Sequence, residues 1–342
     1  MNITSSDIDV IIQGPIFKTG ARTPGNETKG VIESYRDALP NARIILSTWN
    51  GSDVNGINAD EIIFSADPRT IWTQCPPAIN LNRQIVSTNA GLEKSSRLYC
   101  LKTRTDLPIN HDGFIELYKK WANRSRSAKQ FKDRIVVMEI FTLSSRRSNY
   151  CYQLSDLSQF GLGQDIKELW DIPIYRWTLE AASHEKQTLS HIPEWHWSNE
   201  QYLWIKNMQK HRDFSLHAIC SDEDHAEWER QLANNFIIAT QKQYGIYWRG
   251  KLTIRAWAQT INHDEWKSLF RTHSQQNTIP RASLSRIIKH VIYALDKRES
   301  LALRVYARFY HWIVPKGSSI PPLRGWSLVH ALWRKLTHIF LP

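Results

Sequence analysis

Cysteine is scarce in this chain of 342 residues, and its positions show no metal-binding or redox spacing. The sequence contains no CxxC motif and no pair of cysteines at a spacing typical of zinc sites or small disulfide frameworks. The four positions are Cys75, Cys100, Cys151 and Cys220. We therefore predict neither a disulfide framework nor a zinc site, and a reducing compartment fits this composition best.

Long apolar segments are also missing. A membrane-spanning helix needs roughly 18 uninterrupted apolar residues, and no run in the sequence approaches that length. The N-terminal segment MNITSSDIDVIIQGP lacks the basic region and apolar core of a secretory signal. These absences predict a soluble or peripheral protein, and we expect it in the cytoplasm.

The common catalytic signatures are absent as well. The sequence has no P-loop, no GxGxxG after its first predicted strand, no HExxH and no GxSxG. The familiar templates of nucleotide hydrolases, dehydrogenases, zinc peptidases and serine hydrolases are therefore excluded, and any chemistry has to come from other residues.

Acidic residues are fewer than basic ones, and the excess of positive charge is uneven. The chain carries 44 Lys and Arg against 33 Asp and Glu, a net charge of +11. Residues 281–342 contribute +9 of this charge, because Asp296 and Glu299 are their only acids. The basic surface is therefore predicted to lie in the C-terminal region.

The same C-terminal region shows apolar residues at helical spacing. Three predicted helices each present one apolar face, and these faces include Trp312, Trp326 and Trp333. We predict two parts, a domain at residues 1–280 and a basic amphipathic helical region at residues 281–342. The second part either packs on the protein core or docks on the anionic surface of the inner membrane.

Short apolar runs alternate with helical patterns over much of the first part. The predicted strands are 9–12, 43–49, 61–64, 98–101, 135–143 and 150–154, with a loop at 155–163. The predicted helices are 30–39, a stretch after Pro77 that ends near Glu93, 112–122 and one that begins after Ser198. This alternation favours βαβ units, so we predict an α/β domain with a mostly parallel sheet flanked by helices.

Charged residues follow the strand at 98–101. The strand runs into Lys102, Arg104 and Asp106 and is closed by Pro108. Because the carboxyl ends of parallel strands converge on one crevice, these residues predict a site for a phosphorylated ligand, with or without a divalent metal. The same pattern also suits a solvated strand end with surface ion pairs.

Two other strand ends supply further candidates. Gln13, Gly14 and Pro15 follow the first strand, and Trp49 and Asp53 lie at the end of the second. Each residue alone is weak evidence, since Asp53 is more often a turn residue. Their common position at strand ends is what suggests a shared site.

Two acids are candidates for a catalytic base. Asp156 follows the predicted strand at 150–154, and Glu200 lies in the first turn of a helix that begins with a capping box, Ser198 with Gln201. A helix N-terminus stabilises an ionised carboxylate and so lowers the basicity of Glu200. Asp156 is also typical of a cap or of a residue that binds sugar hydroxyls, so both candidates stay open.

Several segments occur together in a recognisable order. They are IDVIIQGPI, ILSTW, NLNRQIVSTNAGL, LKTRTDL, LSDLSQFG and PEWHWSNEQYLW. In this order, over about residues 8–206, they resemble the WavE family of lipopolysaccharide-synthesis proteins. That family is regarded as glycosyltransferase-like, with the nucleotide-diphosphosugar transferase architecture called GT-A. The resemblance thus implies a GT-A-like sheet for this chain.

The resemblance also has one departure. GT-A proteins usually bind a metal and diphosphate through Asp-x-Asp at the end of the fourth strand. The matching triplet here is Arg104-Thr105-Asp106, so a cation replaces the first acid. The resemblance implies a divalent metal, Mn or Mg, at Asp106, whereas Arg104 suits direct neutralisation of the diphosphate. Metal dependence therefore stays open.

The resemblance implies a glycosyltransferase that moves a sugar from a nucleotide-sugar donor to lipopolysaccharide or another cell-surface glycan, with a lipid-linked glycan as acceptor. Asp106 with a divalent ion, Arg104 and Arg83 would stabilise the departing diphosphate. The remaining expected roles are nucleotide binding by Gln13, Gly14, Pro15, Trp49, Asp53 and Lys102, and proton removal by Asp156 or Glu200. The alternative is a non-catalytic membrane- or polyanion-binding protein that retains the fold. No nucleic-acid partner is expected, because no nucleic-acid-binding motif accompanies the charge.

Overall fold

The computed structural model describes most of the chain up to residue 274 and little beyond it. The described residues are 2–18, 27–70, 80–148, 150–176, 197–217, 220–248, 250, 253–274, 287–290 and 292–294. The chain divides into two compact units, Met1–Gly250 with Thr260–Arg286 and Lys251–Gln259 with Ile287–Pro342. The helices predicted for residues 281–342 lie outside the described residues, apart from short helical stretches near the start of that region.

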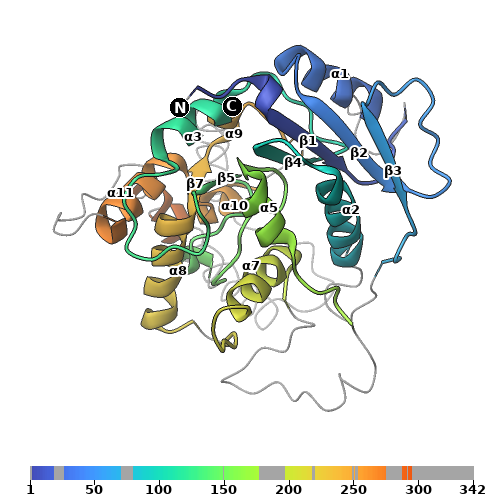
Figure 1. Ribbon diagram of the computed structural model, residues 1–342. Helices are drawn as coiled ribbons and strands as arrows, with labels where there is room; N and C mark the ends of the chain where they lie inside the picture. Colours follow the sequence, from blue (N-terminus) through green and yellow to red (C-terminus); the bar gives the residue numbers. More distant parts are fainter. Residues whose placement is uncertain are drawn as a thin grey trace, which may run out of the picture. The chain divides into compact units, whose positions relative to one another are not determined.

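The described part of the first unit contains a sheet of seven strands, in the order β3-β2-β1-β4-β6-β5-β7 (Figure 1). The strands are β1 (Ile8–Gln13), β2 (Arg43–Trp49), β3 (Glu61–Ser65), β4 (Tyr99–Arg104), β5 (Ile135–Met138), β6 (Gln159–Leu162) and β7 (Phe236–Ala239). All neighbours pair in parallel except β6, which runs antiparallel to β4 and β5. The predicted GT-A-like, mostly parallel sheet flanked by helices is thus confirmed.

Helices connect most of these strands. They are α1 (Thr28–Ala38), α2 (Leu81–Lys94), α3 (Gly113–Trp121), α4 (Ser145–Ser148), α5 (Gly163–Trp170), α7 (Asn199–Gln209), α8 (Asp222–Asn235), α9 (Gln241–Tyr244), α10 (Ile254–Gln259) and α11 (His263–Ser274), with a 3₁₀ turn at Ser5–Asp7. The capping box predicted for α7 is present, because Gln201 N donates to Ser198 Oγ at 3.1 Å and Ser198 N donates to Gln201 Oε1 at 3.2 Å. The start of α7, and with it Glu200, is therefore defined locally.

Most strands of the sheet are buried on both faces, as parallel strands between helical layers should be, whereas the edge strand β3 is only partly buried. All residues of β1 are buried. Helices α2 and α5 pack on one face and α1 and α3 on the other, and adjacent residues of β4 show this alternation. Lys102 lies beneath the ring of Trp170 in α5, whereas Thr103 accepts a hydrogen bond from Tyr35 of α1 at 3.0 Å. The two faces of β4 thus meet different helical layers.

Helix α2 packs very closely on the sheet because it presents a glycine there. A Cβ atom at Gly91 would lie 2.4 Å from Cγ2 of Ile11 in β1. This close approach brings the N-terminal half of α2 to the carboxyl end of β1, where Ser87 Oγ donates to Gln13 Oε1 at 2.7 Å. Helix α2 therefore forms one wall of the region where a ligand is expected.

Of the strands predicted in the second half of the first unit, one is too long and one is wrong. The strand predicted at 135–143 ends at Met138, and Phe141 has a left-handed backbone with φ of 66°. Residues 150–154 are not a strand, because Tyr152 also has a positive φ, 63°, which interrupts an extended chain. The strand in this part is β6, inside the stretch predicted as a loop.

The cysteine prediction is also wrong in one respect. Cys151 and Cys220, 69 residues apart in the sequence, form a disulfide bond with a Cα–Cα distance of 6.5 Å. The spacing carries no motif, so the pairing depends on tertiary structure alone. Cys100 in β4 is buried with a free thiol.

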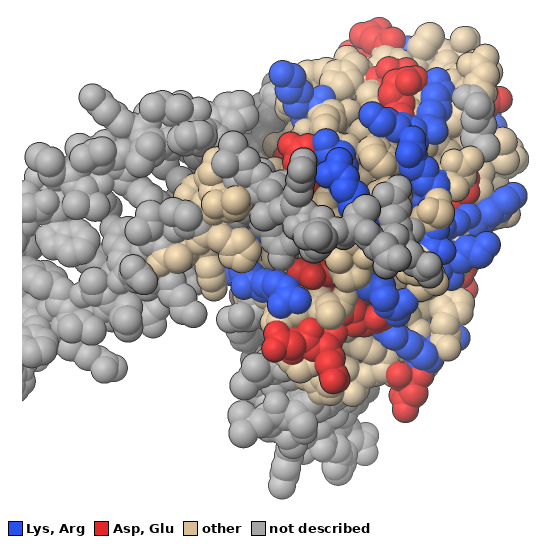
Figure 2. Space-filling view, turned by 90° about the vertical axis from the view of Figure 1, so that its left-hand side faces the viewer, with Lys and Arg blue, Asp and Glu red and all other residues tan. Residues whose placement is uncertain are grey.

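The described surface carries its cations unevenly. Figure 2 shows the side of the molecule that bears α3, α8 and α11 in Figure 1, and Lys and Arg gather across the middle of it. The end of α3 and the stretch after it supply exposed Lys120, Arg124, Lys129 and Lys132. Basic surface is thus not confined to the C-terminal region. No helix in the described part of the chain has the length and apolar character needed to cross a membrane.

Candidate functional site

A pocket of about 250 Å³ lies at the carboxyl ends of β1, β2 and β4. From β1 the chain builds β2 and β3 on one side and then returns to β4 on the other, so the strand order reverses here. In open α/β sheets ligands bind at such a reversal. The pocket is lined by seven of the predicted residues, Gln13, Gly14, Pro15, Trp49, Arg83, Arg104 and Asp106.

The loop after β1 is held tightly against the end of β4. Gly14 has φ of 130°, and a Cβ atom there would lie 2.8 Å from Thr105 Oγ1. Thr105 Oγ1 donates to Pro15 O at 2.7 Å, and Thr105 N donates to Gln13 O at 3.1 Å. A glycine is therefore required both by the backbone conformation and by the space.

Amide and aromatic side chains line another part of the pocket. Gln13 is buried, and its Oε1 accepts a hydrogen bond from Ser87 Oγ. Oε1 of Gln84 is buried and has no hydrogen-bond partner among the described residues. Phe17 and Trp49 also line the pocket. Flat apolar rings beside polar amides suit a ligand with an aromatic, hydrogen-bonding part.

Arg104 and Asp106 form a bidentate ion pair in the pocket. Nε of Arg104 donates to Oδ1 of Asp106 at 2.9 Å, and Nη2 donates to Oδ2 at 2.8 Å. Burial alone would lower the pKa of Arg104, but Asp106 raises it, together with Asp156 and Glu200. The guanidinium group of Arg104 therefore stays charged at the carboxyl end of β4.

Arg83 of α2 forms a second pair of the same kind. Its Nε and Nη2 donate to the two carboxylate oxygens of Asp67 at 2.7 and 2.6 Å. These hydrogen bonds raise the pKa of Arg83 and lower the pKa of Asp67. Two guanidinium groups thus line the same pocket, each oriented by a carboxylate.

Asp156 and Glu200 are brought together, although 44 positions separate them in the sequence. Burial and, as a smaller cause, the neighbouring charge of Asp156 together raise the pKa of Glu200 to about 7. Hydrogen bonds at the start of α7, from the backbone and Ser198, oppose this shift, as does Arg104. The helix N-terminus does act as the sequence predicts, but burial and Asp156 outweigh it. Glu200 is thus matched to proton transfer near neutral pH.

Lys102 does not line the pocket, contrary to its predicted role. Its side chain is buried, Nζ lies 4.3 Å from the centre of the Trp170 ring, and it donates a hydrogen bond to the carbonyl of Asp156. Burial lowers the pKa of Lys102 to about 7. Lys102 therefore holds the backbone that carries Asp156 rather than contacting a nucleotide.

Asp53 also lies away from the pocket lining. Its carboxylate forms an exposed ion pair with Lys18, at 2.5 Å. It further accepts a hydrogen bond from Asn55 N at 3.1 Å, which is the turn contact that its sequence position also suited. The loop that follows Trp49 turns away after the strand ends.

Some pocket residues were missed by sequence reasoning. They are Phe17, Asp67, Asn80, Gln84 and Thr105. Asp67 follows the third predicted strand and so carried the same strand-end signal as the others. Gln84 is next to Arg83 in α2. Because the sequence already suggested Arg83 as a ligand-binding residue, its neighbours in the same helix could also have been considered.

The described residues gather no group of three potential metal ligands around Asp106. Its carboxylate accepts two hydrogen bonds from Arg104, and the cluster of three potential metal ligands found among the described residues is Cys151, Cys220 and His225. A divalent ion usually needs several oxygen ligands. The geometry around Asp106 therefore favours a guanidinium over a metal as the local cation.

The fold defines a GT-A-like α/β protein with a charged pocket at the carboxyl edge of the sheet. The family model described as WavE lipopolysaccharide synthesis matches residues 8–298, so the chain belongs to that family. The match extends well past residue 206, where the resemblance read from the sequence ended. No curated protein matches the chain.

Solved structures show only distant likeness. The 4-diphosphocytidyl-2C-methyl-D-erythritol synthase of Anaerococcus prevotii is 12% identical, with 60% of this chain and 98% of that one covered and a TM-score of 0.29. HddC of Yersinia pseudotuberculosis is 10% identical, with 47% and 79% covered and a TM-score of 0.26. The HddC complex with GMP-PN is 8% identical, with 47% and 78% covered and a TM-score of 0.25. These scores are too low to carry any argument about function.

Proposed function

We propose that this protein is a glycosyltransferase that moves a sugar from a nucleotide-sugar donor to a lipopolysaccharide or related glycan acceptor. The observation that carries the proposal is the pairing of a charged strand-end guanidinium, Arg104, with a carboxyl group, Glu200, whose pKa is about 7. One group suits a departing diphosphate and the other suits the proton of an attacking hydroxyl. Membership of the WavE family supports the glycan acceptor.

The donor is proposed to lie along the pocket with its base near Phe17 and Trp49. Its diphosphate would then face Arg104 and Arg83. A guanidinium has five N–H groups, and Arg104 uses only Nε and Nη2 toward Asp106. The remaining N–H groups suit phosphate oxygens, so Asp106 would orient the cation that stabilises the leaving group. A divalent ion at Asp106 stays a prediction that chelation tests.

Glu200 is the proposed base, and its burial, together with the charge of Asp156, keeps its pKa high. Removal of the acceptor proton by Glu200 would let the hydroxyl attack the sugar carbon as the diphosphate leaves. Lys102 would hold Asp156 in place through its hydrogen bond to the backbone carbonyl of Asp156. The acceptor is proposed to be lipid-linked, and the protein to work as a peripheral protein on the cytoplasmic side of the inner membrane.

The test measures release of nucleoside diphosphate from a panel of nucleotide sugars by the full chain. We expect one donor to be turned over, with slow release to water and faster release when glycan acceptor is added. Glu200→Gln should reduce release by about 10²–10⁴-fold, the usual contribution of a general base. Lys18→Ala, which alters only the exposed pair with Asp53, is the control. A donor that binds but is never cleaved would instead indicate the non-catalytic binding protein.

A further inference from the structure

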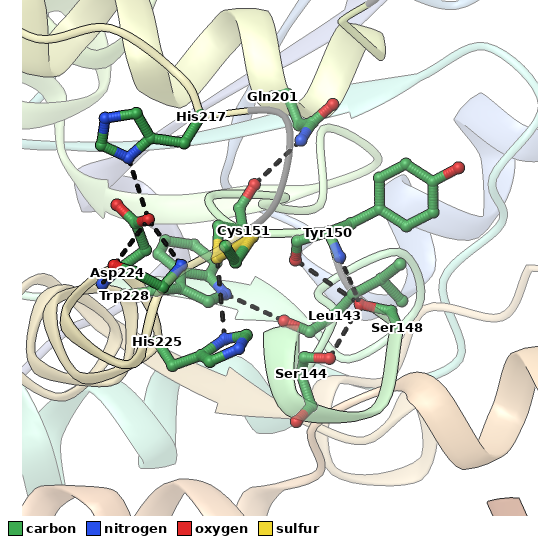
Figure 3. The surroundings of a disulfide bond; sticks show 12 residues. Leu143, Ser144, Ser148, Tyr150, Cys151, Gln201, His217, Asp224, His225 and Trp228 are labelled. Carbon is green, nitrogen blue, oxygen red and sulfur yellow. Dashed lines mark hydrogen bonds and ion pairs between the residues drawn. A yellow bond between two sulfur atoms is a disulfide. The ribbon is translucent and has the colours of Figure 1, made fainter. Parts of the chain in front are cut away.

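The Cys151–Cys220 disulfide lies beside a histidine and joins two distant parts of the chain (Figure 3). Cys151 is buried, and Cys220 is partly exposed immediately before Ser221, the N-cap of α8. His225 lies in α8, and its Nδ1 is 3.8 Å from Cys151 Sγ. The Sγ atoms of Cys151 and Cys220 and a ring nitrogen of His225 all lie within 4.8 Å of one another. A partly exposed sulfur beside an imidazole, as in Cys220, is typical of reactive cysteines.

Cys151 is linked directly to the helix that carries the proposed base. The carbonyl of Cys151 accepts a hydrogen bond from Nε2 of Gln201 at 2.9 Å. The other end of the same amide, Oε1, accepts from Ser198 N and so completes the cap of α7. Gln201 directly follows Glu200, so a shift of Cys151 acts on the first turn of α7.

Cys151 also begins the segment that ends at Asp156. Tyr152 holds a positive φ of 63°, which a tyrosine adopts only where its surroundings impose it. Here its ring packs edge-on against Phe214, at 4.9 Å between ring centroids, and against Trp228. The disulfide thus anchors one end of a short segment whose other end carries an acid of the proposed site.

We propose that Cys151 and Cys220 are a site of reversible oxidation that controls the placement of Glu200 and Asp156. This inference rests on the proposed function for its effect on turnover, but not for the chemistry of the site. In the disulfide form the two acids are held together. Reduction frees Cys151 and loosens both the segment to Asp156 and the cap of α7.

The reductant in the exchange is a small dithiol. Its thiolate attacks Cys220 Sγ, the more exposed sulfur, and the bond to Cys151 breaks. Cys151 leaves as a thiolate, 3.8 Å from Nδ1 of His225, and takes up the proton that the attacking thiol gave to the solvent. The second thiol of the reagent then displaces Cys220 and closes a cyclic disulfide. The protein gains two electrons and two protons, and the dithiol loses them. In the reducing compartment that the sequence led us to expect, disulfides are usually transient, catalytic or redox-sensing ones.

The first experiment maps the bond in the full chain. Alkylation of the oxidised protein followed by mass spectrometry should leave Cys151 and Cys220 unlabelled and joined in one pair of peptides. After treatment with dithiothreitol both should be labelled. A titration across ratios of reduced to oxidised dithiothreitol should be reversible. Absence of the Cys151–Cys220 peptide pair after oxidation would overturn the proposal.

The second experiment tests the coupling. Amide hydrogen exchange should become faster on reduction at residues 151–156 and in the first turn of α7. Turnover should fall by about tenfold or more, as misplaced catalytic groups cause. Cys220→Ser should behave as the reduced protein in every redox buffer, whereas Cys100→Ala, which alters the buried free thiol, should keep the full response.

The two proposals fail in different ways. Exchange that stays unchanged while the bond is shown to be reduced would mean that the disulfide is structural only, and would overturn the inference. A redox-dependent change in exchange without turnover of any nucleotide sugar in either state would contradict the proposed function and leave the redox site in place.

Discussion

Arg104 donates two hydrogen bonds to the carboxylate of Asp106, two residues further along the chain. The pair stands where the family resemblance leads one to expect two acids and a metal. The Arg104 side chain thus supplies a cation at this position, and the carboxylate of Asp106 orients its guanidinium group. A guanidinium in this position can face a diphosphate without requiring a metal.

The first prediction concerns Arg104→Asp, which restores the two-acid triplet. If Arg104 binds the diphosphate, the affinity for nucleoside diphosphate should fall by about 2 kcal/mol or more, the strength of a charge-assisted hydrogen bond or pair of them. Isothermal titration calorimetry with and without Mn²⁺ measures this. Retained affinity, or tighter binding that needs Mn²⁺, would show that a metal does the work instead.

The second prediction concerns Asp106→Asn, which keeps the shape and removes the charge. Because the carboxylate orients the guanidinium, turnover should drop by about 10²–10³-fold, as when one electrostatic stabiliser of a transition state is lost. The melting temperature is measured beside turnover, because the variant also loses the ion pair with Arg104. Wild-type turnover in excess EDTA is the companion measurement: activity that survives supports Arg104 as the cation, and activity that vanishes supports a metal at Asp106.

The pocket could be predicted because strand ends converge by geometry. Each of β1, β2 and β4 reads as an apolar run followed by a polar residue, and the parallel arrangement places those residues together. Lys102 could not be placed this way. Lys102 is on the same face of β4 as Arg104 but two residues earlier, where Trp170 of α5 covers it. The sequence shows which residues of β4 share a face, but it does not show how far along that face α5 extends.

Strand β6 and the disulfide escaped prediction for related reasons. Gln159 to Leu162 includes Gly161, and a short run with a glycine resembles a loop. It is a strand because Gln159 and Phe160 find partners on opposite faces. Gln159 Oε1 accepts from Trp170 Nε1 at 2.6 Å, while the ring of Phe160 packs against Phe114. The pairing of Cys151 with Cys220 likewise depends on contacts that no local pattern encodes.

The third prediction tests the loop after β1. Gly14→Ala should destabilise the protein by about 1–3 kcal/mol, because φ is positive and Thr105 Oγ1 occupies the space of a Cβ. Gly30→Ala is the matched control. Gly30 lies inside α1 with open space around its Cα, so alanine there should stabilise by about 0.5–1 kcal/mol. Urea denaturation measures both changes, and equal effects of the two substitutions would contradict the reading of Gly14.

The fourth prediction concerns residues 281–342, proposed as a membrane-docking region. Each basic residue near an anionic leaflet contributes about 1 kcal/mol, and salt screens the attraction. The full chain should co-sediment with anionic vesicles at low salt and not with neutral ones, and a chain ending at Pro280 should lose this binding. Equal binding by the shorter chain would point to the exposed cations after α3, which Lys129→Glu and Lys132→Glu would then test. Unfolding of the shorter chain would favour core packing of the region.

The last prediction is the pH dependence set by Glu200. Its pKa is raised from 4.5 to about 7, so the base is ionised only above that pH, and turnover should rise with pH through about 7. Glu200→Gln should remove this limb of the profile along with most activity, whereas Glu33→Gln, at an exposed position of α1, should leave both unchanged.

The raised pKa of Glu200 also makes the folding stability depend on pH. Between pH 4.5 and about 7 the folded state holds a proton on Glu200 that the unfolded state has lost. The stabilisation from this protonation is therefore complete at low pH and is lost as pH rises through about 7. Above pH 7 the ionised pair of Glu200 and Asp156 costs stability, and Glu200→Gln should melt higher than the wild type there. A variant that melts lower than the wild type at pH 8, with an unchanged pH profile of activity, would mean that Glu200 is not the titrating base.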